Sequence, residues 1–167
     1  MAAGRDEGGI AMLRISEFLT EEMILPDLKA TDKEGVLREM AHHLCTFAAG
    51  IGDAEDRVVR ALLDRERLGS TGVGEGVAIP HAKVPGLARL TAAFGRSMRG
   101  IPFEAIDQQP VTLVVALLVP ENSAGVHLKA LASISSLLKN PAFREGLQRA
   151  GGQAPLYRAF LEEDSRC

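Results

Sequence analysis

The sequence predicts an α/β fold: a single-domain sandwich in which helices flank a mixed β-sheet on both faces. The 167 residues are enough for one domain with a substantial core, and the 46% hydrophobic and 25% charged residues are typical of a globular protein. Residues 111–119 form a continuous run rich in Val and Leu, which is typical of a central strand. Segments with helical periodicity lie both before and after the expected strands, which favours helices on both sides of a sheet.

The first half of the chain predicts one edge strand and two helices. We expect residues 1–12 to be a disordered tail, residues 13–163 to form the domain and residues 164–167 to be a C-terminal tail. Residues 23–28 predict a short strand that Pro26 confines to a sheet edge. A helix should then begin with a capping box at Thr31-Asp32-Lys33-Glu34. Its expected inward side chains are Val36, Leu37, Met40, Ala41, Leu44 and Phe47. Asp53 is expected to cap a second helix, whose buried stripe is Val58, Val59, Leu62 and Leu63.

The second half predicts three strands and three helices. Residues 77–79 should form a brief buried strand that ends at Pro80, and residues 90–98 and 111–119 form longer ones. Ser123 is expected to cap a helix that runs to about residue 139. The inward side chains of that helix are expected to be Leu128, Leu131, Ile134 and Leu138. Asn140-Pro141 is typical of a helix start and predicts a helix to about residue 150, followed by a short one at 155–162.

Composition excludes several classes of function. A net charge of -3, no Lys/Arg cluster, one Tyr and no Trp argue against a nucleic-acid partner. Cys45 and Cys167 lie too far apart to suggest a disulfide framework, which fits a reducing cytoplasm. No apolar run approaches the ~20 residues of a membrane helix, so we expect no membrane insertion. His42 and His43 are adjacent on a helix and point apart, so they cannot both ligate one metal well, and no Cys/His spacing suggests zinc. We expect no metal, and no other cofactor.

A glycine-rich loop is the first candidate site. Its candidate phosphoryl-binding residues are Gly69, Ser70, Thr71, Gly72, Gly74 and Gly76. Glycines let a backbone approach a ligand closely, and successive N–H groups can form an anion nest. The loop lacks the Gly-Lys-Ser/Thr ending of a Walker loop, and no predicted strand precedes it as a dinucleotide fingerprint requires. The two hydroxyls are also common turn residues, and neither has an evident base to activate it.

Three side chains complete the candidate chemistry. His81 follows the brief strand and the glycine loop, where a neutral imidazole can act as a nucleophile, although a lone His is more often a surface or core residue. His127 falls in the first turn of its predicted helix, where the helix dipole disfavours the protonated ring; packing against the sheet is an equally good reading. Arg65 precedes the loop and can pair with phosphoryl oxygens, or simply lie in solvent at a helix end. Together these groups suit transient capture of a phosphoryl group on nitrogen.

The stretch from Leu63 to Ala82, with its Asp64-Arg65-Glu66 and Ile79-Pro80-His81 elements, resembles the active-site region of the fructose/mannitol-type enzyme IIA domains of the bacterial phosphotransferase system. It is most similar to the nitrogen-regulatory branch of that family. Residues 103–111, Leu118-Val119-Pro120 and His127-Leu128 extend the resemblance, which covers roughly residues 13–163. Ala82 departs from the glycine that is commonest there, but it is still small.

The resemblance implies a mixed sheet flanked by helices and a phosphoryl group carried on Nε2 of His81. Arg65 and His127 would match the active-site arginine and second histidine of the family. The donor would be a phosphohistidine on a small HPr-like carrier protein (NPr), and the phosphorylation state would regulate other proteins. One alternative is a sugar-specific IIA component that serves a separate IIB. Another is a non-catalytic module that binds an anion.

Overall fold

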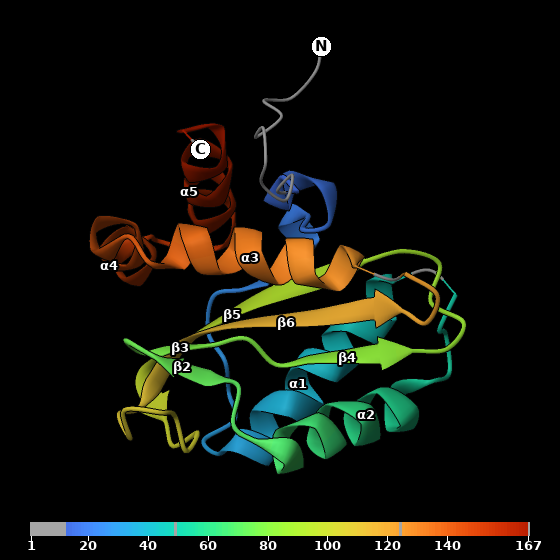
Figure 1. The fold of residues 1–167 in the computed structure, drawn as a ribbon. Coiled ribbons are helices and arrows are strands. Elements are labelled where there is room, and N and C mark those ends of the chain that lie inside the picture. The colour runs from blue at the N-terminus through green and yellow to red at the C-terminus, as the bar shows by residue number, and fades with distance from the viewer. Residues whose placement is uncertain (1–12, 49, 124, 167) are drawn as a thin grey trace.

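In the computed structural model, residues 13–48, 50–123 and 125–166 are described, and they form one mixed β-sheet with helices on both faces (Figure 1). The predicted tail at 1–12 and Cys167 lie outside these residues. The strands are β1 (Ile24–Leu25), β2 (Gly72–Gly74), β3 (Val77–Ala78), β4 (His81–Val84), β5 (Thr91–Ile101) and β6 (Val111–Pro120). The helices are the 3₁₀ turns η1 (Ile15–Glu17) and η2 (Glu21–Met23), and α1 (Lys33–Phe47), α2 (Glu55–Leu68), α3 (Val126–Leu138), α4 (Pro141–Arg149) and α5 (Gln153–Arg166).

The sheet is built around β6, as its apolar sequence predicts. β6 pairs antiparallel with β5 on one side and parallel with β3 and β4 on the other, and all but its residues Thr112 and Pro120 are buried. β1 pairs parallel with β5 at one edge, where Pro26 was expected to place it. The mixture of parallel and antiparallel pairs and the helices on both faces confirm the predicted fold class.

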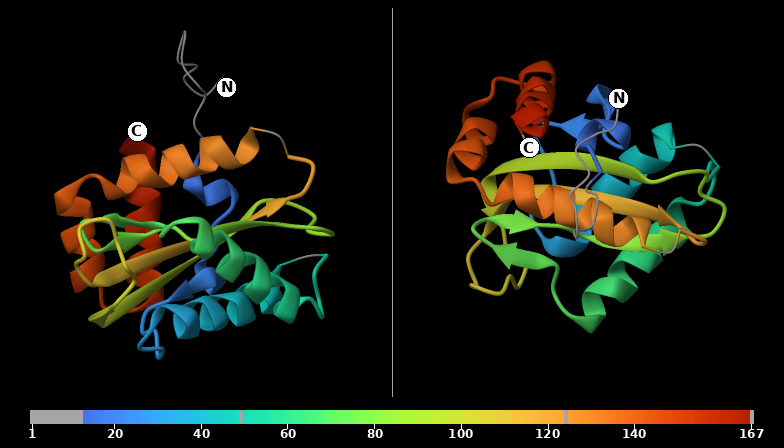
Figure 2. Two further views of the ribbon diagram at one scale, coloured as in Figure 1. Left: turned by 60° about the horizontal axis from the view of Figure 1, so that its bottom comes forward. Right: turned by 45° about the horizontal axis from the view of Figure 1, so that its top comes forward.

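Two layers of helices cover the sheet (Figures 1 and 2). α1 and α2 pack together on one face, against β5 and β4 respectively. α3 and α5 cover the other face together with η1, and α4 packs against α3 and α5. The Phe160 ring of α5 packs edge-on against the Phe94 ring of β5, with ring centroids 4.9 Å apart. The Phe143 ring of α4 also packs against the Phe160 ring, with its centroid 5.3 Å from that of Phe160. No helix among the described residues is long and apolar enough to cross a lipid bilayer.

Two predicted helix starts in the first half are wrong. Asp32, rather than Thr31, is the N-cap of α1, and its carboxylate accepts the Gly35 N–H at 2.7 Å. α2 begins after Ala54 without a side-chain cap, so Asp53 does not fill that position. The buried stripes are otherwise as predicted, except that Phe47 is 48% exposed and Leu63 only partly buried.

Corrections in the second half concern α3 and α5. The N-cap of α3 is Gly125, with φ +83°, while the Ser123 hydroxyl donates to the Pro120 carbonyl. Leu128 then faces outward and is 56% exposed. The C-terminal tail predicted from residue 164 is wrong through Arg166, because α5 continues to that residue and buried Asp164 accepts the Ile15 N–H at 3.1 Å. The Asn140 cap of α4 is confirmed by its bond from Ala142 N at 3.0 Å.

The glycine-rich segment is more ordered than the prediction of a loop. β2 and β3 form an antiparallel hairpin, and Glu75 takes a positive φ of +58° at its turn. β3 and β4 then lie one after the other along the same side of β6, with Pro80 in the break between them. A break suits proline, which has no N–H for the ladder, while its carbonyl still accepts from Leu117 at 2.8 Å. This arrangement places His81 at the start of β4.

Candidate functional site

β4 lies between the end of α2 on one face of the sheet and the start of α3 on the other (Figure 1). Residues of these three elements line a cleft of about 460 Å³. It brings together the three side chains singled out from the sequence: Arg65 from α2, His81 from β4 and His127 from α3. The remaining lining residues are Ala61, Asp64, Leu68, Ala82, Lys83 and Val119. The cleft therefore joins residues more than sixty positions apart around one histidine.

The His81 ring is held by the backbone two residues before it. Nδ1 lies 2.9 Å from the carbonyl oxygen of Ile79. A carbonyl can only accept, so the hydrogen bond assigns the proton to Nδ1. Nε2 then carries the lone pair, and it accepts no hydrogen bond from any residue in the described ranges. A neutral imidazole with a free Nε2 lone pair is the form that can attack an electrophile.

The surroundings also favour the neutral ring. Burial lowers the pKa of His81 from its usual value, because the charged form is poorly solvated there. Arg65 and His127 lower the pKa further, while the bond to the Ile79 carbonyl and the charge of Glu66 act in the opposite direction. The net result is a ring that stays unprotonated at neutral pH.

The Arg65 guanidinium has one nitrogen in a hydrogen bond and the others unpaired among the described residues. Arg65 lies in the last turns of α2, is half-buried, and its Nη1 donates to the Gly69 carbonyl at 2.9 Å. Within the described part of the chain it forms no ion pair, whereas its neighbours Asp64 and Arg67 pair with each other. The other N–H groups of the guanidinium are thus available for an anion in the cleft.

His127 lies in the first turn of α3, as predicted, and is partly buried. Its Nδ1 is inaccessible to solvent and has no hydrogen-bond partner among the described residues. An unpaired buried N–H is the costlier of the two choices, so we assign the proton to Nε2. Nε2–H is then a donor on a residue that lines the cleft.

The structure does not bring the glycine segment into the cleft. The N–H groups of Gly69 and Thr71 donate to Glu66, that of Gly72 donates to the Ser70 hydroxyl and that of Glu75 to Asp107. The Ser70 hydroxyl donates to the Phe103 carbonyl at 2.8 Å, and the Thr71 hydroxyl to the Glu66 carboxylate. Neither these residues nor Gly74 and Gly76 line the cleft. The glycines serve the turn and the hairpin instead: a Cβ on Gly72 would lie 2.7 Å from that of Ala105.

Sequence reasoning missed Lys83 and Leu68 in the cleft lining. Lys83 follows His81 by two positions on β4, and alternation along a strand would have placed both on one side had β4 been recognised. No group of three or more His, Cys, Asp or Glu side chains in the described ranges is placed to hold a metal ion.

Comparison with known proteins gives a consistent result. Residues 17–163 match the model of the family described as "Phosphoenolpyruvate-dependent sugar phosphotransferase system, EIIA 2". A nitrogen regulatory protein of Bradyrhizobium diazoefficiens is 41% identical over 143 residues, which are 86% of this chain and 92% of that protein. The PTS system fructose-specific EIIABC component of Bacillus subtilis is 38% identical over 91% of this chain, which spans only 24% of that longer protein.

The fold agrees with these sequence matches. The crystal structure of the nitrogen regulatory protein IIA-Ntr from Neisseria meningitidis superimposes with a TM-score of 0.80 at 33% identity, covering 87% of this chain and 98% of that one. The family model spans nearly all of the described residues, including all three cleft side chains. The chain therefore belongs to the EIIA 2 family of the phosphoenolpyruvate-dependent sugar phosphotransferase system.

Proposed function

We propose that this protein is a nitrogen-type IIA phosphocarrier: His81 accepts a phosphoryl group from a phosphohistidine on an HPr-like carrier (NPr), and the phosphorylation state regulates binding to other proteins. The observation that carries this proposal is the 2.9 Å hydrogen bond between His81 Nδ1 and the Ile79 carbonyl. It fixes the tautomer whose Nε2 lone pair is free, in a cleft that also contains Arg65 and His127.

The transfer needs no net proton movement at His81. The Nε2 lone pair attacks phosphorus, a new N–P bond forms, and the N–P bond to the donor imidazole breaks with its electron pair returning to the donor nitrogen. Nδ1 keeps its proton and its bond to Ile79 throughout. Because the phosphoryl group passes between two imidazoles, the protein contributes mainly position and charge stabilisation.

Arg65 and His127 supply that stabilisation. The free end of the Arg65 guanidinium donates to the equatorial oxygens of the transferring group, where charge is spread in the transition state. Nε2–H of His127 donates to the same group from the opposite wall of the cleft. The resulting phosphohistidine carries about two negative charges, enough to change which surfaces the cleft rim can bind.

A regulatory role is favoured by the similarity to nitrogen regulatory proteins, with 41% identity over 92% of one such protein and a TM-score of 0.80 to another. The second candidate is a sugar-specific IIA that passes phosphate to a separate IIB, and the 38% identity to a fructose-specific EIIABC component supports it. Transfer from the phosphorylated protein to a purified fructose-type IIB would favour this candidate over the first. A third, non-catalytic anion-binding module, predicts no phosphorylation at all.

Intact-mass measurement after incubation with phosphoenolpyruvate, an enzyme I homologue and NPr tests the proposal. Wild type should gain one acid-labile phosphoryl group, and His81→Ala should gain none. His42→Ala is the matched control, because His42 is an exposed histidine on α1 outside the cleft, and it should be phosphorylated like wild type. Phosphorylation of His81→Ala would refute the site. Failure of wild type, with a competent donor shown on a control acceptor, would favour the anion-binding module.

A further inference from the structure

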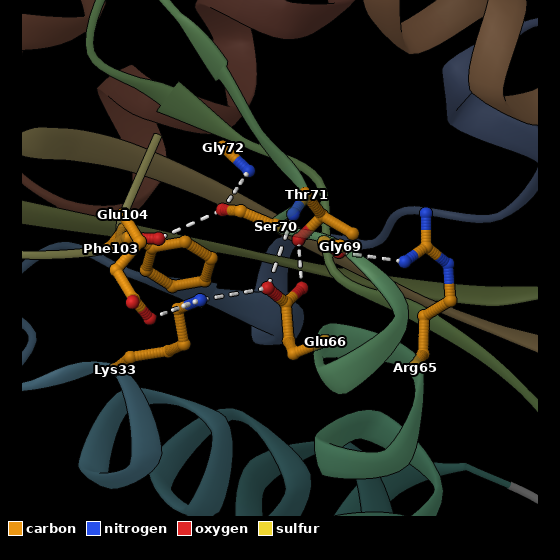
Figure 3. Close-up of polar contacts among 9 residues, drawn as sticks. All are labelled: Lys33, Arg65, Glu66, Gly69, Ser70, Thr71, Gly72, Phe103 and Glu104. Atoms are coloured by element: carbon orange, nitrogen blue, oxygen red, sulfur yellow. Dashed lines mark hydrogen bonds and ion pairs between the residues drawn. The ribbon is translucent and has the colours of Figure 1, made fainter. Parts of the chain in front are cut away.

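One buried carboxylate near the cleft in the chain, that of Glu66, is not among the cleft-lining residues. Glu66 is in the last turns of α2, next to Arg65, yet its side chain is only 4% exposed. One carboxylate oxygen accepts the Thr71 N–H at 3.1 Å and the other accepts the Thr71 hydroxyl. Lys33 Nζ, at the start of α1, lies 3.2 Å from the same group (Figure 3). The cluster does not line the cleft, and apart from the effect of the Glu66 charge on the pKa of His81 it has no part in the chemistry described above.

Lys33 offsets the energetic cost of burying the charged Glu66 carboxylate. An isolated carboxylate in such a place is costly, and it persists only when paired and hydrogen-bonded. Lys33 is itself held by exposed Glu104 at 3.3 Å and lies 4.9 Å from the centre of the Phe103 ring (Figure 3). With Lys33 as its ion-pair partner, the Glu66 carboxylate can accept hydrogen bonds from both the N–H and the hydroxyl of Thr71.

One path of hydrogen bonds leads from Glu66 to Arg65. The Glu66 backbone carbonyl accepts the Gly69 N–H at 3.1 Å, and its carboxylate accepts the Thr71 N–H, so Glu66 binds both ends of the Gly69–Thr71 turn. The Gly69 carbonyl accepts from Arg65 Nη1 at 2.9 Å (Figure 3). The orientation of the guanidinium therefore depends on where this turn is held.

A second path leads to His81. The Thr71 carbonyl accepts the Ile79 N–H at 3.0 Å, and the Ile79 carbonyl accepts from His81 Nδ1 at 2.9 Å. Glu66 is thus three hydrogen bonds away from the ring: Glu66 to Thr71, Thr71 to Ile79 and Ile79 to His81. Both paths pass through the short turn that Glu66 clamps.

We propose that Glu66, held by Lys33, is a positioning residue for phosphoryl transfer: its clamp on the Gly69–Thr71 turn sets both the Arg65 guanidinium and the Ile79 carbonyl that orients His81. The proposal rests on the proposed function, since the groups positioned are those that act on the phosphoryl group. Glu66 is buried and does not line the cleft, so in this proposal it acts through other residues. Its loss should lower the rate of transfer within the complex and leave the affinity for the carrier unchanged.

The test uses Glu66→Gln and Thr71→Val, which weaken the clamp from either side while nearly preserving volume. Thr71→Ser keeps the hydroxyl and should restore the wild-type rate. Asp164→Asn is the matched control, because Asp164 is another buried carboxylate that accepts backbone N–H groups, at Ile15 and Ser16, on α5 away from the cleft. Should Glu66→Gln fail to fold, Thr71→Val carries the test alone. It removes only the hydroxyl bond to Glu66 and keeps the bond from the backbone N–H of residue 71.

Two readouts separate positioning from mere stability. The single-turnover rate constant at saturating phosphorylated NPr, corrected for folded fraction, should fall about 10- to 100-fold in Glu66→Gln and Thr71→Val, with the half-saturating NPr concentration unchanged. Nitrogen NMR of the unphosphorylated protein should show His81 moving from the Nδ1–H tautomer towards a mixture in the same variants. Asp164→Asn should lower the melting temperature without changing either readout.

The proposal is overturned if the two clamp variants lose stability as Asp164→Asn does but keep the wild-type rate and tautomer. It is also overturned if only the half-saturating concentration changes. Failure of the proposed function looks different, because wild type itself would then not be phosphorylated. The tautomer measurement needs no phosphoryl donor and would still decide whether Glu66 positions His81.

Discussion

Arg65→Lys separates the shape of the arginine side chain from its charge. In the structure, Nη1 of Arg65 is already committed to the Gly69 carbonyl, and the rest of the fork is free for phosphoryl oxygens. A lysine keeps the positive charge but cannot reach Gly69 and present a planar fork at the same time. The substitution should therefore remove about one charge-assisted hydrogen bond in the transition state, worth about 1.5–3 kcal/mol. At 1.36 kcal/mol per tenfold, this corresponds to a rate loss of about 10- to 150-fold.

Rapid-quench measurement of single-turnover transfer from phosphorylated NPr to the protein checks this value. Arg67→Lys is the matched control: Arg67 lies two residues further along α2, is exposed, pairs with Asp64 and does not line the cleft. Its rate should remain that of wild type. An unchanged rate for Arg65→Lys, or an equal loss in both variants, would refute the role given to the guanidinium.

Four further results are expected. Because burial lowers the pKa of His81, the transfer rate should stay constant as pH falls through about 6.5, the usual histidine value, and decline only below it. Below that pH the unfolded chain binds more protons than the folded one, so wild type should lose stability on acidification relative to His81→Gln, as measured by urea unfolding. His127→Ala should slow transfer while His127→Gln, which keeps an N–H donor, retains part of the rate in the same quench assay. Asp32→Ala should lower the free energy of unfolding by about 1 kcal/mol through loss of the bond to Gly35, without changing the rate.

The parts of the fold with strong local signals could be predicted from the sequence. β6 is a continuous apolar run, and the start of α4 depends on Asn140-Pro141 alone. Where two neighbouring residues can each cap a helix, as Thr31 and Asp32 can, the sequence does not tell which one is the N-cap. Backbone geometry decides which side chain reaches the free N–H. Strands β2, β3 and β4 are two to four residues long, and they depend largely on pairing with distant β6 or with each other.

The same distinction applies to the candidate site. The sequence placed Arg65, His81 and His127 as candidates, and the structure brings these three together in one cleft. The glycines pointed to a phosphate cradle because their spacing is compatible with one. Only the fold shows that the Thr71 N–H and hydroxyl are occupied by Glu66, and that Lys33, more than thirty residues earlier, balances the charge. Pairings of this kind leave no periodicity in a single sequence.

The position of β4 affects how separate copies of the molecule meet. Among the described residues β4 pairs with β6 alone, so its outer side is an open sheet edge. Open edges invite strands from other molecules, and proteins discourage this with short strands and charged side chains. β4 has four residues and exposed Lys83. A dianionic phosphoryl group on His81 would add like charges to the same edge in every copy. Under the proposed function, the modification that carries the signal would also discourage self-association along β4.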